Sequence, residues 1–281
     1  MNKKFLILDC NYLAHRAKYA MGGLSIDEIP TGVVYGFLRD IVAFTERFDT
    51  KHIIFCWDSK YSKRKEIYPQ YKANRQKNEL TEDEEKCEIE FRKQVKKLRR
   101  YYLKQIGFKN IFQQKGYESD DIIASVCQKL PKGDTGIIIT ADQDLYQCIS
   151  PTVSMYDPRK RKMMTLQGFK KQYGILPYQW IRMKCLSGCN SDNIKGIKRV
   201  GEKTAIKYIR GEMNELSKIR DNIIAWAYNE QFMFKQMSLI RLPFEGTKIF
   251  KLRKDKLSES GWNSVCKKLG IKTAKYPFKD R

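Results

Sequence analysis

Gly136-Ile-Ile-Ile-Thr-Ala-Asp-Gln-Asp144 is the stretch of sequence that decides the fold class. It begins as a short apolar run rich in β-branched residues, which is typical of a buried strand in a parallel sheet. Two similar runs, residues 5–10 and 53–58, lie earlier in the chain, and residues 32–48 between them carry apolar side chains at helical spacing. This alternation predicts an α/β fold with a mostly parallel central sheet flanked by helices.

Acidic residues follow each of these three predicted strands. Asp9 and Asp58 end the first two runs, and Asp142 and Asp144 follow the third. Because ligands bind at the carboxyl ends of strands in an open parallel sheet, we expect these side chains to share one crevice. Further acids stand at the start of a predicted helix and before a glycine-bounded turn; they are Glu118, Asp120, Asp121 and Asp192.

This set of acids predicts a site for two divalent metal ions. Carboxylates at short range repel one another, and divalent cations relieve the repulsion. Oxygen ligands without histidine or a pair of thiolates suit Mg²⁺, for which Mn²⁺ can substitute. Two such ions hold the attacking and leaving oxygens of a phosphodiester and replace a histidine base.

The charge balance points to the substrate. The chain has 281 residues with 55 Lys and Arg against 32 Asp and Glu, a net charge of +23. Such a charge indicates a nucleic acid or an anionic membrane surface as the partner. Acids that bind metal, together with a basic surface, favour a nuclease over a transcription factor, which would not need the acids.

Other features exclude several classes of protein. No run of 18 apolar residues is present, which argues against a membrane-spanning helix. The eight cysteines form no CxxC pair, so we expect reduced thiols and a cytoplasmic protein, in a bacterium or in the host of a phage. The chain has only two histidines, which argues against a histidine zinc site and against a Ser-His-Asp triad.

Two segments are suited to binding DNA. Residues 60–77 interleave basic and aromatic side chains, a pattern that suits a single strand because charge follows the backbone while rings stack on bases. Residues 79–106 then have the spacing of one long amphipathic helix or two. After Asp192, Gly196 and Gly201 bound a turn between two predicted helices, which indicates a helix–hairpin–helix that grips duplex backbone.

Several segments match a known family in residues and in order along the chain. They are Leu8-Asp9 with Arg16, 31–36, Trp57-Asp58, Tyr71-Lys72 with Arg75, 116–121, 140–144, 191–193 and 201–205. Together they resemble the 5′ nuclease (flap endonuclease) family of bacteria and phages, which includes the N-terminal nuclease domain of bacterial DNA polymerase I. The resemblance runs from about residue 5 to residue 242.

The resemblance implies a PIN-like architecture in two regions. Residues 1–173 would form the α/β nuclease core, with a helical arch at about 60–105 through which a single-stranded 5′ flap passes. Residues 174–281 would form a mainly helical DNA-binding region, with the helix–hairpin–helix at about 185–210.

The resemblance also assigns roles to residues. The first metal ion would be held by Asp9, Asp58, Glu118 and Asp120, with Asp121 close by, and the second by Asp142, Asp144 and Asp192. Catalytic cations near the scissile phosphate and the reacting strand would be Lys72, Arg75 and Lys184. DNA would further contact Arg16, Tyr71, Gly196, Gly201 and Lys203, with K⁺ bound at the helix–hairpin–helix.

The implied activity is that of a structure-specific 5′ nuclease, a monomer that cuts flaps, nicks or RNA–DNA hybrids in replication or repair. A single-strand-binding protein or a polymerase would be its partner. An RNA-directed nuclease of the wider PIN-like class would share the acids but have no reason to carry the helix–hairpin–helix.

One departure from the family pattern stands at Cys189, three residues before Asp192, where the family usually has Asp. A thiol is a poor ligand for Mg²⁺. Either the second metal ion is held more loosely and Mn²⁺ supports activity better, or this position lies outside the ligand set. A non-catalytic protein that holds branched DNA is the alternative function that Cys189 favours.

Overall fold

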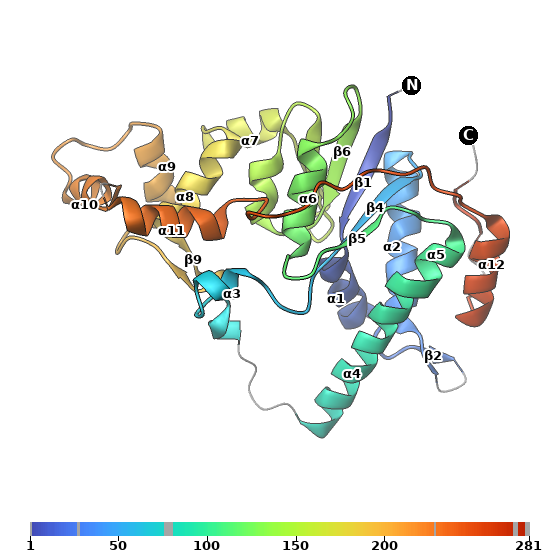
Figure 1. Cartoon of the computed structure of the whole chain (residues 1–281). Helices are drawn as coiled ribbons and strands as arrows, with labels where there is room; N and C mark the ends of the chain where they lie inside the picture. The colour runs from blue at the N-terminus through green and yellow to red at the C-terminus, as the bar shows by residue number, and fades with distance from the viewer. Residues whose placement is uncertain (1, 27–28, 76–80, 228, 272–274, 279–281) are drawn as a thin grey trace.

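Figure 1 shows a computed structural model of the chain, in which residues 2–26, 29–75, 81–227, 229–271 and 275–278 are described. A six-stranded sheet has the strand order β5-β4-β1-β6-β7-β8. The first five strands in that order run parallel and β8 is antiparallel to β7, which confirms the mostly parallel sheet. The strands are β1 Lys4–Asp9, β4 His52–Trp57, β5 Ile111–Gln113, β6 Thr135–Ile139, β7 Val153–Asp157 and β8 Lys162–Met164.

Both faces of the sheet are covered by helices, because successive side chains of β1 point to opposite sides. Leu6 and Leu8 belong to one buried cluster, and Phe5 and Ile7 belong to the other. The first cluster includes α1 Cys10–Met21, α2 Gly32–Phe48, α4 Glu82–Lys97, α5 Leu103–Ile106 and α12 Glu259–Lys268. The second includes α6 Ser119–Gln128, α7 Leu166–Tyr173, α8 Trp180–Ser187, α9 Glu202–Ile209 and α10 Lys218–Ala227.

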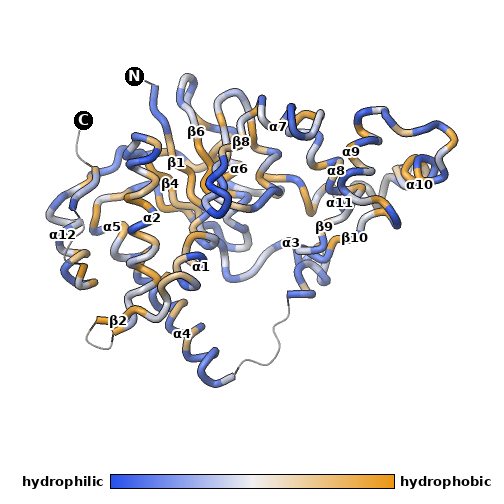
Figure 2. Tube along the Cα trace, turned by 180° about the vertical axis from the view of Figure 1, so that it is seen from behind, coloured by the Kyte–Doolittle hydropathy of each residue, from blue (hydrophilic) through white to orange (hydrophobic). Residues whose placement is uncertain are grey.

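The segment that the sequence assigns to an arch contains one continuous helical rod. A capping box starts α4, since Thr81 Oγ1 accepts a hydrogen bond from the Glu84 N–H and Glu84 Oε2 accepts one from the Thr81 N–H. A π-helical turn, η2 Leu98–Tyr102, joins α4 to α5, and Gly107 ends the rod with a φ of 108°. In Figure 2 the central strands are mostly orange, whereas α4 is mostly blue and extends away from them. Residues 76–80, between this rod and η1 Ala73–Arg75, lie outside the described part of the chain.

The part of the chain after residue 173 is mainly helical, as predicted. Between α8 and α9 it forms a small hairpin, β9 Gly188–Cys189 and β10 Ile194–Lys195, joined by the short turn η5 Asn190–Asp192. It continues through α11 Glu230–Ile240. Among the described residues, no helix is both long and apolar enough to cross a membrane. The division of the chain at residue 173 stays a prediction.

Candidate metal centre

Two acids and a threonine from three strand ends converge at the carboxyl edge of the sheet. Asp9 is the last residue of β1, and Asp58 directly follows β4. Ser119, the first residue of α6, donates its N–H to Asp58 Oδ1 at 2.6 Å and its hydroxyl to Asp9 Oδ1 at 3.2 Å. Thr140, which directly follows β6, donates its hydroxyl to Asp9 Oδ2 at 2.9 Å. The start of one helix and the end of a third strand therefore hold these two carboxyl groups together.

Burial and like charge raise the pKa values of the acids at this edge, and the charge of Lys72 opposes the shift only in part for Asp58 and Asp120. Burial, and after it the charge of Asp58, raises the pKa of Asp9 to about 7. Burial also raises the pKa of Asp58, although hydrogen bonds from Ser119 oppose the shift. The pKa of Asp120 is raised well above its ordinary value, by burial and then by the charges of Asp142 and Asp9. Such shifts mean that the ionised forms are disfavoured unless a cation is present.

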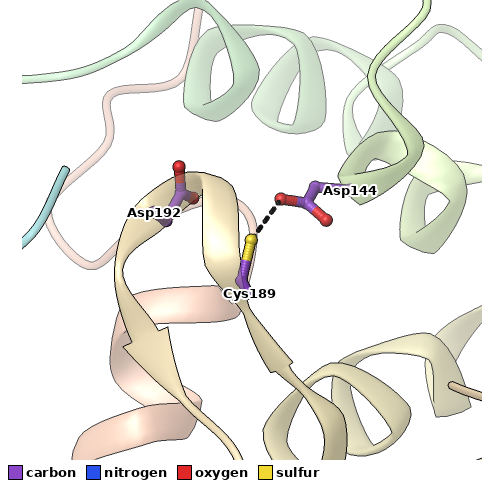
Figure 3. Close-up of side chains that lie close together, drawn as sticks. All are labelled: Asp144, Cys189 and Asp192. Atoms are coloured by element: carbon purple, nitrogen blue, oxygen red, sulfur yellow. Dashed lines mark hydrogen bonds between the residues drawn. The ribbon is translucent and has the colours of Figure 1, made fainter. Parts of the chain in front are cut away.

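Asp144, Cys189 and Asp192 form a second group, shown in Figure 3. One ligand atom from each residue lies within 4.8 Å of those of the other two. The Cys189 thiol donates to Asp144 Oδ2 over 3.8 Å, and its Sγ lies 3.1 Å from Ser191 Oγ. Burial and the two neighbouring carboxylates raise the pKa of Cys189 to about 11.

Lys72 lies beside acids of both groups, and Arg75 lies beside Asp192 of the second. Lys72 Nζ donates to Glu118 Oε2 at 2.8 Å and lies 3.8 Å from Asp192 Oδ1. Arg75 Nη2 donates to the same Asp192 oxygen at 2.9 Å. Lys72 has a left-handed backbone with a φ of 56°, uncommon for a residue with a side chain, and its N–H donates to the Asp192 carbonyl at 2.9 Å. Burial would raise the pKa of Glu118, but the charges of Lys72 and Arg64 outweigh it and lower that pKa.

The charges of the whole site do not balance. Lys184 Nζ pairs with Asp144 Oδ1 at 2.7 Å. Together with Arg64, Lys72 and Arg75 it makes four cations near eight carboxyl groups, so full ionisation of the acids would leave four negative charges, which two divalent cations would balance. A cavity of about 20 Å³ between the two groups is lined by Glu118, Asp120, Asp144, Cys189 and Asp192, among other residues. A volume of this size holds about one water molecule.

Two residues that the sequence assigned to the site make contacts that the sequence did not predict. Tyr71 is only 2% exposed and donates its hydroxyl to Glu118 Oε2 at 2.9 Å, so its ring is not free to meet DNA. Asp121 is fully buried, and Arg64 donates to both of its oxygens at 2.7 and 2.8 Å. Asp121 is therefore the partner of Arg64 in this structure, and its part in holding a metal ion stays a prediction.

The remaining candidates lie apart from the acids. Arg16 pairs with Asp40 of α2. At Gly196 a Cβ atom would come within 2.4 Å of the backbone of Ser187 and Gly188, so the close packing of the hairpin needs glycine here, and contact of Gly196 with DNA stays a prediction. Gly201 precedes α9. A Cβ atom at Gly201 would have no heavy atom within 4 Å other than those of the glycine itself and its two chain neighbours. Lys203 is exposed in the first turn of α9.

Arg64 is the residue of this site that sequence reasoning missed. It belongs to α3 Arg64–Ile67 and is one of seven basic residues in the run from 60 to 77. A basic residue inside a basic run gives no signal of burial. The one available hint is local: Arg64 stands in a short segment that also carries Tyr71, Lys72 and Arg75.

The sequence has relatives of known description. A family described as 5′-3′ exonuclease, N-terminal resolvase-like domain, matches residues 4–174. A 5′-3′ exonuclease of Bacillus subtilis (strain 168) is 30% identical over 245 residues, which cover 84% of this chain and 79% of that protein. A thermostable DNA polymerase I of Thermus thermophilus is 32% identical over 225 residues, which cover 78% of this chain and 26% of the polymerase. This chain thus spans about a quarter of the length of the polymerases that it matches.

The fold is also found among solved structures. A structure of T5 5′-exonuclease with bound divalent metal ions (zinc) matches with a TM-score of 0.71 at 22% identity, covering 86% of this chain and 90% of that one. A T5 D15 flap endonuclease in complex with DNA and metal ions matches with a TM-score of 0.71 at 21% identity, with the same coverage. At these identities the likeness establishes the fold alone.

Proposed function

The chain belongs to the 5′-3′ exonuclease family, and on this premise we propose that it is a structure-specific, divalent-metal-dependent 5′ nuclease. It hydrolyses phosphodiesters near 5′ ends or branch junctions of DNA, in the removal of flaps or primers. The observation that carries the proposal is the gathering of two acid groups, with cations between them, at the carboxyl edge of the sheet. The names of the relatives, exonuclease and flap endonuclease, support the same activity.

Two Mg²⁺ ions fit the donor set, which consists mostly of carboxylate oxygens. Asp9, Asp58, Glu118 and Asp120 would hold the first ion, and Asp142, Asp144 and Asp192 the second. When bound, the ions activate water and stabilise charge on the phosphate. The excess of four negative charges at the site supports two divalent ions over one.

Lys72 and Arg75 would bind the scissile phosphate. Burial would lower the pKa of Lys72, but the charges of Glu118 and Asp192 raise it, so the ammonium group stays protonated. A permanently charged donor beside the reacting phosphate stabilises the charge that develops in the transition state. In the absence of metal ions, the same side chains neutralise Glu118 and Asp192.

The alternative function is a protein that holds branched DNA without cutting it, and the place of Cys189 among the second group of acids favours it. The test uses four 5′-labelled substrates with Mg²⁺: a DNA flap, a nicked duplex, an RNA–DNA hybrid and single-stranded RNA. We expect the flap to be cut fastest and the RNA slowest. Binding without cutting would favour the alternative, and preferred cutting of RNA would point to an RNA-directed nuclease.

We expect Cys189→Asp to lower the Mg²⁺ concentration for half-maximal cleavage by roughly tenfold, since an oxygen ligand replaces a thiol that suits Mg²⁺ poorly. The ratio of the rates in Mn²⁺ and Mg²⁺ should fall with it. The control is Cys189→Ala, which removes the thiol without adding a ligand. An unchanged metal requirement in Cys189→Asp would place this position outside the ligand set.

The exposed end of α9 would grip the duplex. Gly201 leaves space for a phosphate at the N-terminal amides of α9, and Lys203 lies in the first turn of the same helix. The resemblance suggests K⁺ as a cation bound at this helix–hairpin–helix. Lys203→Ala should weaken binding to duplexes of any sequence and reduce the slope of log K against log salt concentration by about 1. Lys129→Ala, at the far end of α6 from the site, is the control. Equal slopes for Lys203→Ala and the unaltered protein would rule out this contact.

A further inference from the structure

Arg64 is only 2% exposed, although arginine is rarely buried. Its guanidinium donates to both Asp121 oxygens at 2.7 and 2.8 Å, and its Nε donates to the Leu239 carbonyl at 2.8 Å. Nη1 also lies 3.7 Å from Glu118 Oε2. The group sits 4.6 Å from the ring centroid of Phe244. One side chain thus touches the start of α6, the end of α11 and the chain that follows α11.

Asp121 completes this connection. Its Oδ2 accepts the N–H of Glu118 at 3.1 Å, and its Oδ1 accepts the N–H of Phe244 at 2.8 Å. Within the described part of the chain, this buried carboxylate therefore links the Arg64 guanidinium to the backbone of Glu118 and to that of Phe244. The backbone where α6 begins is tied to the segment 239–244, far away in the sequence.

Glu118 connects this hydrogen-bond network to the proposed metal-binding acids. Tyr71 and Lys72 donate to its Oε2, while Asp121 holds its backbone N–H. Asp120, the other proposed ligand on this turn, lies in the sequence between Glu118, which Asp121 holds, and Asp121, which Arg64 holds. Groups that orient metal ligands typically change metal affinity or activity by about 10–100-fold when they are altered.

We infer that Arg64 is a positioning residue for the metal-binding carboxylates: with Asp121 it clamps the start of α6 to the segment 239–244, and so fixes Glu118 and Asp120. The inference rests on the proposed function, since it assumes that these acids bind metal ions. Arginine is needed because its planar fork reaches both Asp121 oxygens and the Leu239 carbonyl at once. Lysine would keep the charge and lose this geometry.

The experiment measures Mn²⁺ binding by calorimetry without DNA, and flap cleavage at several Mn²⁺ concentrations, for Arg64→Lys and for Phe244→Leu. For Arg64→Lys we expect Mn²⁺ affinity to fall by about tenfold or more, kcat at low Mn²⁺ to fall in parallel, and the KM for DNA to stay within about twofold. Phe244→Leu keeps the backbone bond to Asp121 and should change affinity in the same direction but less. Ile41→Val, in the opposite buried cluster, controls for loss of stability.

Two results would overturn the inference. Unchanged Mn²⁺ affinity with a raised KM would mean that Arg64 acts on DNA, and unchanged affinity and kinetics with a lower melting temperature would mean a purely structural role. Because metal binding is read without substrate, a protein that binds Mn²⁺ and cuts nothing would end the proposed function and still test Arg64. If the unaltered protein bound no Mn²⁺, the proposed function and the proposed role of Arg64 would both be wrong.

Discussion

Asp120→Asn should reduce flap cleavage by about 10³-fold or more, because it removes a ligand from ions that supply several kcal/mol of transition-state stabilisation. The same substitution should stabilise the metal-free protein. Burial and the charges of Asp142 and Asp9 hold the pKa of Asp120 well above its ordinary value of 3.8, so its carboxylate costs folding energy near neutral pH. Asparagine has nearly the same shape without the charge.

The sign of this effect depends on pH. Between pH 3.8 and the raised pKa, the folded protein holds a proton on Asp120 that the unfolded chain has lost. The unfavourable contribution of Asp120 therefore grows as pH rises above its ordinary pKa and vanishes at lower pH. In EDTA, the melting temperature of Asp120→Asn should exceed that of the unaltered protein at pH 7.5, and the gap should close near pH 4.

Melting curves in EDTA and in Mg²⁺ check this prediction, with Asp221→Asn on the exposed face of α10 as the control. Added Mg²⁺ should stabilise the unaltered protein and help Asp120→Asn much less. A variant that lost activity and also melted earlier in EDTA at pH 7.5 would show that the Asp120 carboxylate stabilises the fold and is not destabilised by neighbouring negative charges.

Lys72→Ala should lower the single-turnover rate of flap cleavage by about 10²–10³-fold, because it removes a charged donor aimed at the reacting phosphate. The same substitution should not weaken the binding of metal ions. Lys72 Nζ now pairs with Glu118 at 2.8 Å and lies 3.8 Å from Asp192, so it competes with metal ions for these carboxylates. Removing it should leave Mn²⁺ affinity without DNA unchanged or higher.

Calorimetric titration with Mn²⁺ and rapid-quench cleavage test the two halves of this prediction. Lys65→Ala is the matched control, since Lys65 is an exposed lysine of the neighbouring helix α3. If Lys72→Ala lost metal affinity along with its rate, Lys72 would act by holding Glu118 in place and not by binding phosphate.

The parts of the fold that the sequence predicts are those with a local signal. The runs 5–10, 53–58 and 136–140 correspond to β1, β4 and β6, and residues 32–48 coincide with α2. A buried parallel strand is a continuous apolar run, and a helix covering it has a regular stripe, so both are visible without tertiary information. The acids after these strands were likewise predictable, since strand polarity alone puts them at one edge.

The contacts around Arg64 have no such signal. Arg64 and Leu239 are 175 residues apart, and Asp121 and Phe244 are 123 apart. Asp120 and Asp121 are identical neighbours in the sequence, and only the position of Arg64 decides which of them is engaged in an ion pair. Tyr71 similarly looks like a stacking residue within a basic run, yet it is buried under Glu118. Pairing between distant segments cannot be read from composition or periodicity.

Metal-dependent cleavage is measured with a 5′-labelled flap on a DNA duplex, incubated with the protein in Mg²⁺, in EDTA, and with Asp120→Asn in Mg²⁺. We expect the unaltered protein in Mg²⁺ to release short labelled products that end near the junction. We expect no such products in EDTA and at most traces with Asp120→Asn. A flap that the unaltered protein binds and leaves uncut in both Mg²⁺ and Mn²⁺ would mean that the chain is not a metal-dependent 5′ nuclease.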